Sequence, residues 1–178
     1  MIEVFSNDEY HVYIDSDALV FTPIRINGRV LLLPPPGVKP PQFYSILAVL
    51  LVRSGIEVIM PRRHLPCSKS SLTWAINKLL RRYNYDIIIM LGFDLVAINY
   101  PKLVIEFSGD SIIRQLVRSN VPGSVHGLPI NECTWIKDSI KRADLSVDEE
   151  LPSLNTIVKI RDLVLNRGLH LVGVSKNN

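Results

Sequence analysis

The spacing of apolar and polar positions predicts strands in the first part of the chain. Residues 10–21 mix β-forming side chains with an acidic turn, which predicts two short strands. Asn27-Gly28 favours a type I′ turn and lies between the apolar segments 21–26 and 29–33, so these predict a β-hairpin. The second segment is apolar without alternation, as in a strand covered on both faces. Pro23 places the first segment at a sheet edge.

Helical and strand patterns alternate after residue 40. This alternation implies an α/β fold, with a mostly parallel sheet, right-handed crossovers and helices on both faces. Ligands of such sheets bind beyond the carboxyl ends of the strands, so the loops after the strands are the places to search for chemistry. The predicted helices cover residues 40–53 and 70–83, the strands cover 56–60, 86–91 and 103–107, and the loops are 34–39, 61–69, 92–99 and 108–110.

The last third of the chain is predominantly helical. Residues 144–152 are acidic and end in a proline, which indicates a linker. We therefore expect an α/β domain with an N-terminal β-hairpin at residues 1–143, and a C-terminal helix and strand at 153–178. The patterns predict helices over 112–118, 132–142 and 153–166, and a short strand over 169–174.

Composition is typical of one folded domain. The chain has 178 residues, of which 47% are hydrophobic and 21% are charged, so disorder is excluded. A net charge of +3 is too small to indicate a nucleic-acid binder by itself. The N-terminus lacks a secretory pattern and the apolar stretch 43–52 is too short to span a bilayer, so we expect a cytoplasmic protein without membrane contact. Cys67 and Cys133 lack metal-ligand spacing, and we expect reduced thiols.

Several motifs of catalysis and cofactor binding are missing from the sequence. The loop Pro34-Pro35-Pro36-Gly37 offers few N–H groups to a phosphate, so we expect no nucleotide cofactor. The four histidines are scattered without a second ligand nearby, so we expect no metal site. Gly92-Phe93-Asp94 has the position of a nucleophile elbow but carries neither Ser nor Cys, so Asp94 is either a nucleophile or an ordinary loop aspartate. The histidines are His11, His64, His126 and His170.

The segment 29–110 resembles the front half of the DHH phosphoesterase superfamily, which includes the RecJ exonucleases. The resemblance rests on the succession VLLLPPPG, VLLVRSGIEVIM, YDIIIMLGFD and PKLVIEFSGD. Family members hold two divalent ions with carboxylates and histidines that follow these strands. Here the corresponding places retain Asp94 and Asp110 as carboxylates, which are too few to hold two ions.

The resemblance therefore implies a degenerate, non-catalytic DHH domain. Degenerate members of the family act in the CMG replicative helicase, and the compact chain is similar to an archaeal RecJ-like subunit. It implies DNA replication as the function, with the GINS complex and the MCM helicase as partners. Two alternatives remain open: a small hydrolase or phosphoesterase that uses Asp94, and a binder of single-stranded nucleic acid.

The helix over residues 72–83 carries the candidate binding surface. Its apolar stripe leaves Trp74 on the opposite face among basic side chains, and Trp and Arg are frequent interface anchors. Trp74 is either a partner contact or is covered by another part of the chain. The basic stretch 53–82 fits an acidic protein or single-stranded DNA, and the small net charge favours the protein. The predicted partner-binding residues are Trp74, Lys78, Arg81, Arg62 and Arg63.

Overall fold

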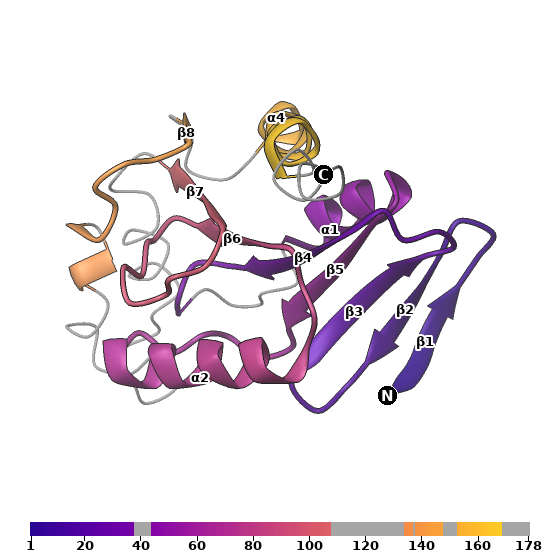
Figure 1. Ribbon diagram of the computed structural model, residues 1–178, viewed down its shortest axis with the longest axis horizontal. Helices are drawn as coiled ribbons and strands as arrows, with labels where there is room; N and C mark the ends of the chain where they lie inside the picture. Colours follow the sequence, from indigo (N-terminus) through magenta and orange to yellow (C-terminus); the bar gives the residue numbers. More distant parts are fainter. Residues whose placement is uncertain (38–43, 108–133, 137, 148–152, 169–178) are drawn as a thin grey trace, which may run out of the picture.

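An eight-stranded mixed sheet forms the centre of the molecule in a computed structural model of the chain (Figure 1). The structure describes all residues except 38–43, 108–133, 137, 148–152 and 169–178. The strand order across the sheet is β1-β2-β3-β5-β4-β6-β7-β8. The strands are β1 (Ile2–Ser6), β2 (Tyr10–Ile14), β3 (Ala18–Pro23), β4 (Gly28–Leu33), β5 (Ile56–Pro61), β6 (Ile87–Leu91), β7 (Lys102–Phe107) and β8 (Leu145–Val147).

The five strands from β5 to β8 in this order are parallel to one another. In β4, Val30 pairs with Val58 of β5 on one side and with Ile87 of β6 on the other. In the next strand pair, Met90 of β6 lies beside Val104 of β7. The apolar side chains of β4, β5, β6 and β7 that the structure describes are buried on both faces, in agreement with the unbroken hydrophobic runs in the sequence, whereas those of β8 are half-buried. The predicted α/β class with a largely parallel sheet is confirmed. All of these strands end at one edge of the sheet.

The predicted hairpin around Asn27-Gly28 is wrong. β5 lies between β3 and β4, so the two predicted hairpin strands do not pair with each other. The Asn27 N–H instead donates to the carbonyl of Gly55 at 2.8 Å, and the chain crosses to the far side of β5. The antiparallel part of the sheet is a β1–β2–β3 meander, in which β2 and β3 are the two strands predicted over residues 10–21. Consequently Pro23 lies at the end of an interior strand and not in an edge strand.

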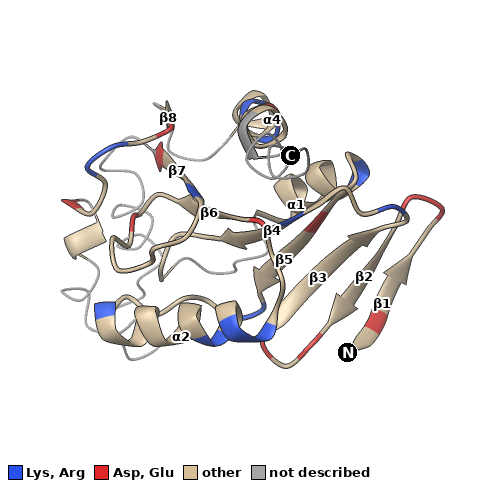
Figure 2. Ribbon diagram, viewed as in Figure 1, with Lys and Arg blue, Asp and Glu red and all other residues tan. Residues whose placement is uncertain are grey.

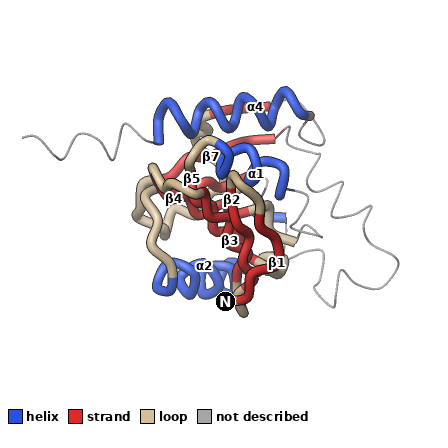
Figure 3. The backbone as a smooth tube through the Cα atoms, turned by 90° about the vertical axis from the view of Figure 1, so that its right-hand side faces the viewer, coloured by secondary structure: helices blue, strands red, loops and turns tan. Residues whose placement is uncertain are grey.

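Helices cover both faces of the sheet, as the sequence predicts. The helices α1 (Ser45–Arg53) and α4 (Leu154–Leu163) lie on one face, and α2 (Lys69–Arg82) lies on the other (Figures 1 and 3). α2 buries Leu72, Ile76 and Leu79 against the sheet, which confirms its apolar stripe. None of the helices in the described part of the chain has the length and apolar character needed to cross a bilayer.

The C-terminal part agrees only partly with the predicted elements. α4 and the π-helical turn η3 (Val164–Gly168) occupy the predicted helix over 153–166. β8 lies within the segment expected to be a linker and pairs with β7. Around residues 134–136 only a short 3₁₀ turn is seen, and the predicted elements over 112–118 and 169–174 lie outside the described residues. Cys67 is buried and disulfide-bonded, so the expected reduced thiol is wrong there.

Candidate functional site

The loop after β6 places Asp94 at the edge where the parallel strands end. Gly92 begins the loop with a φ of 74°, a left-handed conformation that suits glycine, and its N–H donates to the Ile105 carbonyl at 2.7 Å. Phe93 is fully buried and anchors the loop in the core. Residues 92–101 form loop and turn and contain no helix, whereas a nucleophile elbow turns from a strand directly into a helix. The position is that of an elbow, but the helix is missing.

The Asp94 carboxylate is held on one side by Lys102. The Lys102 ammonium bonds Asp94 Oδ1 and donates to the Leu95 carbonyl at 3.2 Å. The Asp94 side chain is 13% exposed and the Lys102 side chain is 23% exposed, so the pair is mostly buried but remains accessible to water. Within the described residues Asp94 Oδ2 has no hydrogen-bond partner, and one N–H of the ammonium has no acceptor. The site thus presents one free carboxylate oxygen beside one free ammonium proton.

The backbone around Asp94 offers little support for an oxyanion. Its own N–H donates to Ser139 Oγ at 3.0 Å, and that hydroxyl donates to the Ile136 carbonyl at 2.7 Å. The Asp94 amide is therefore occupied and does not point at a substrate. Acyl transfer normally depends on preorganised N–H donors aimed at the tetrahedral oxyanion.

The histidines of the described residues lie apart from one another and from the loop that holds Asp94. Within the described ranges no group of three or more His, Cys, Asp or Glu side chains could hold a metal ion. His11 lies on the surface, where its Nδ1 is 3.2 Å from Glu3 Oε2, and His64 lines a pocket near α2. His126 and His170 lie outside the described residues, as does Asp110.

The acidic turn between β2 and β3 pairs with the basic end of α2 (Figure 2). Lys78 Nζ lies 2.6 Å from Asp17 Oδ1, and Arg82 contacts Asp15 and Asp17 at 2.8 and 2.9 Å. The Tyr83 hydroxyl donates to Asp15, and this bond is the main cause that holds the pKa of Asp15 below its usual value. The bond to Lys78 lowers the pKa of Asp17 in the same way. The acidic turn and the basic end of α2 therefore neutralise each other here.

The predicted partner-binding residues share one side of the molecule but differ in their contacts. Trp74 is 68% exposed, which excludes the alternative that another described part of the chain covers it. Lys78 already pairs with Asp17, so its charge is not free for a partner. Arg63 and Arg81 are exposed and have no ion-pair partner in the described part of the chain, whereas the Arg62 N–H donates to the Asp17 carbonyl. The binding role of these residues stays a prediction.

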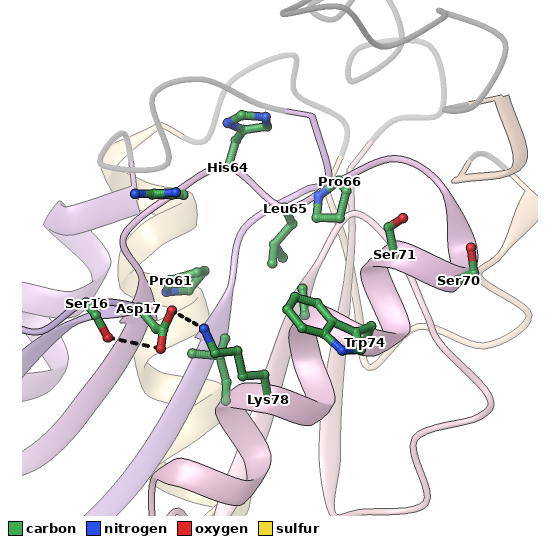
Figure 4. Close-up of a pocket in the computed structure, with 13 residues that line it drawn as sticks. Ser16, Asp17, Pro61, His64, Leu65, Pro66, Ser70, Ser71, Trp74 and Lys78 are labelled. Atoms are coloured by element: carbon green, nitrogen blue, oxygen red, sulfur yellow. Dashed lines mark hydrogen bonds and ion pairs between the residues drawn. The ribbon is translucent and has the colours of Figure 1, made fainter.

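Sequence reasoning missed two features of these sites. It did not foresee the Asp94–Lys102 pair, although the residues are only eight positions apart. Asp94 follows the strand predicted over 86–91, and Lys102 immediately precedes the one predicted over 103–107. It also missed the pocket that Trp74, Arg63 and His64 line together (Figure 4). Both features depend on how loops from separate strands meet, which apolar spacing does not encode.

Comparison of structures identifies similar proteins, whereas comparison of sequences does not. No family model matches the chain, and no curated protein matches it. The structure of a dienelactone hydrolase from Anabaena variabilis is similar with a TM-score of 0.50 and 12% identity over 95% of both chains. An α/β serine hydrolase homologue from Coxiella burnetii has a TM-score of 0.43 and 9% identity over 92% of this chain and 99% of that one. The first similarity shows the fold alone, which is that of the dienelactone hydrolase structure.

This finding contradicts the DHH resemblance and what followed from it. The expectation of a non-catalytic subunit in DNA replication rested on metal ligands that a DHH domain would have lost. Because the fold is not that of a DHH domain, the residues at those positions give no information about lost metal ligands or lost catalysis. The interpretation as a RecJ-like, non-enzymatic protein of the CMG helicase is wrong. No finding bears on GINS, MCM or single-stranded DNA as partners.

Proposed function

We propose that this chain is a small hydrolase that uses Asp94 as its nucleophile. The observation that carries the proposal is that Oδ2 of Asp94 has no hydrogen-bond partner among the described residues and lies beside the Lys102 ammonium, at the edge where the parallel strands end. The α/β hydrolase type of fold supports it, because ligands of such sheets bind at that edge. The cytoplasmic location stays a prediction.

The chemistry of a carboxylate nucleophile favours attack on a saturated carbon. If a carboxylate attacks an ester carbonyl, the carboxylate is a much better leaving group than an alkoxide, so the adduct returns to the reactants. The occupied Asp94 amide also gives the tetrahedral oxyanion no donor. Attack on an sp³ carbon forms an aspartyl ester without passing through a tetrahedral oxyanion. Hydrolysis of that ester places its oxyanion on Asp94 Oδ1, the oxygen that Lys102 contacts. We therefore expect the substrate to be a small molecule with an electrophilic saturated carbon. An epoxide is the example in which Lys102 has a role, because the opened ring leaves an alkoxide that needs a proton.

The two steps balance with the groups at this site. Asp94 Oδ2 forms a bond to an epoxide carbon, the C–O bond of the ring breaks, and Lys102 gives its proton to the departing alkoxide. Water then attacks the carbonyl carbon of the aspartyl ester, the diol leaves, and the carboxylate is restored. The proton released by water returns to Lys102. The net reaction adds one water to the epoxide.

The proposal is tested by hydrolysis of styrene oxide, with 4-nitrophenyl acetate as the acyl comparison. We expect diol formation by the parent protein and a loss of at least about a thousandfold in Asp94→Asn. Asp138→Asn is the matched control, because Asp138 is exposed on another segment. Lys102→Met should slow ring opening, since the alkoxide then lacks its proton donor. Full activity in Asp94→Asn, or hydrolysis of the acetate without the epoxide, would contradict the proposal.

A further inference from the structure

A pocket lies beside α2, on the side of the sheet opposite α1. The loop after β5, the first turns of α2 and the turn between β2 and β3 form its walls (Figure 4). Its volume is about 700 Å³, within the range of sites for small molecules. No residue of the loop after β6 lines it, so the pocket is separate from Asp94.

One positive charge in this pocket, that of Arg63, has no counter-charge in the part of the chain that the structure describes. The pair Lys78–Asp17 is internally neutral, and Figure 4 shows the ion pair on the wall of the pocket. Arg63 also lines the pocket and makes no ion pair or hydrogen bond with any described residue. A guanidinium presents a planar fork of N–H donors that fits a carboxylate in a bidentate manner. The pocket therefore offers a site for a single negative charge.

The other walls are aromatic and apolar. Trp74 is exposed to 68% and lines the pocket, and Lys78 Nζ lies 5.8 Å from the centre of its ring. Leu65, Ala75 and Leu79 supply apolar surface around it. An exposed indole provides a flat face on which another ring can stack. The aromatic and apolar walls together with the Arg63 charge suit a small molecule that has a flat apolar ring and one anionic group.

We propose that this pocket binds a small aromatic carboxylate, with its ring against Trp74 and its carboxylate on Arg63. A carboxylate matches the single free charge, whereas an aryl phosphate brings nearly two negative charges at neutral pH. The proposal does not depend on the function assigned to Asp94. It predicts a ligand site even if the chain has no hydrolase activity.

The test uses 1-naphthoate as the probe, with neutral 1-naphthamide and acetate as comparisons. The chain has two tryptophans, so a ¹⁵N-labelled sample gives two indole N–H signals. The signal of Trp74 is assigned by its loss in Trp74→Leu. We expect naphthoate to shift this signal in a saturable way with a Kd on the order of 1 mM or tighter. The signal of Trp135, whose N–H donates to the Cys67 carbonyl, should stay in place.

Calorimetry on matched variants separates the pocket from general charge attraction. Arg63→Gln should weaken naphthoate binding about tenfold through the lost charge-assisted contact. Arg81→Gln is the control, because Arg81 is also exposed, makes no ion pair with any residue that the structure describes and does not line the pocket. This variant should change Kd by less than about twofold. Asp94→Asn should bind as the parent does. Equal affinity for naphthamide, an equal loss in Arg81→Gln, or no saturable shift would overturn the proposal.

Discussion

Replacing Trp74 by alanine should cost far less stability than replacing Ile76, two positions along the same helix. Trp74 is 68% exposed, so about a third of the side chain is covered, or roughly 80 Å² of a side chain of about 250 Å². At about 25 cal/mol per Å² the loss has an upper limit of ~2 kcal/mol. Alanine recovers about 0.5 kcal/mol as a better helix former. We expect a net loss near 1 kcal/mol.

Ile76 is fully buried, and its truncation leaves a cavity against the sheet. Such changes cost about 2–5 kcal/mol, and we expect about 3 kcal/mol here. In a chain of this length each kcal/mol lowers Tm by about 2–4 °C, so Ile76→Ala should melt about 6–12 °C below the parent and Trp74→Ala only about 2–4 °C below. Thermal and urea denaturation measure both. If Trp74→Ala melts at as low a temperature as Ile76→Ala, then Trp74 is not exposed as described, and the pocket that it lines is not open to a ligand.

Two further predictions concern the turn network and a strained glycine. Because the pKa of Asp15 is held below its usual value of 3.8, its ionised form stabilises the fold above that pH and the benefit is lost as the pH falls through the lower folded value. Asp15→Asn should thus lower Tm at pH 6, and its Tm should converge with that of the parent as the pH falls through the lower folded value. Asp8→Asn, at an exposed residue outside this network, should leave Tm at pH 6 unchanged. Gly55 has a φ of 85°, and an added Cβ would collide with the Asn27 side chain, so Gly55→Ala should cost about 1–3 kcal/mol in urea denaturation. An unchanged urea midpoint for Gly55→Ala would contradict the claim that a side chain at this position is strained.

The sequence carries enough information to place most of the sheet. The runs at β4, β5, β6 and β7 are buried on both faces, so their unbroken apolar pattern predicts them as neighbouring parallel strands. The pattern does not specify which strand lies beside which. Asn27-Gly28 favours a tight turn locally, but the insertion of β5 between β3 and β4 is decided by long-range packing that no local preference reports.

The same limit explains the wrong family. Parallel apolar strands alternating with helices occur in many α/β folds, so the segments around Val30 and Ile88 fit both a DHH domain and an α/β hydrolase. The antiparallel meander beside β5 lies outside the segment that carried the resemblance, so the resemblance took no account of it. At the candidate site the sequence indicated Asp94 by its position after a strand, but the bond from Lys102 depends on the return of β7 beside β6.

Isotope transfer into Asp94 tests the central claim most directly. A single turnover of styrene oxide by excess protein in H₂¹⁸O, followed by peptide mass spectrometry, reports where the hydrolytic oxygen goes. Water attacks the carbonyl carbon of the aspartyl ester in our account, so the peptide that contains Asp94 should gain about 2 Da while the diol carries the oxygen of the unlabelled carboxylate. Label in the diol with none in Asp94 would mean that water attacks the substrate directly, and would contradict Asp94 as the nucleophile.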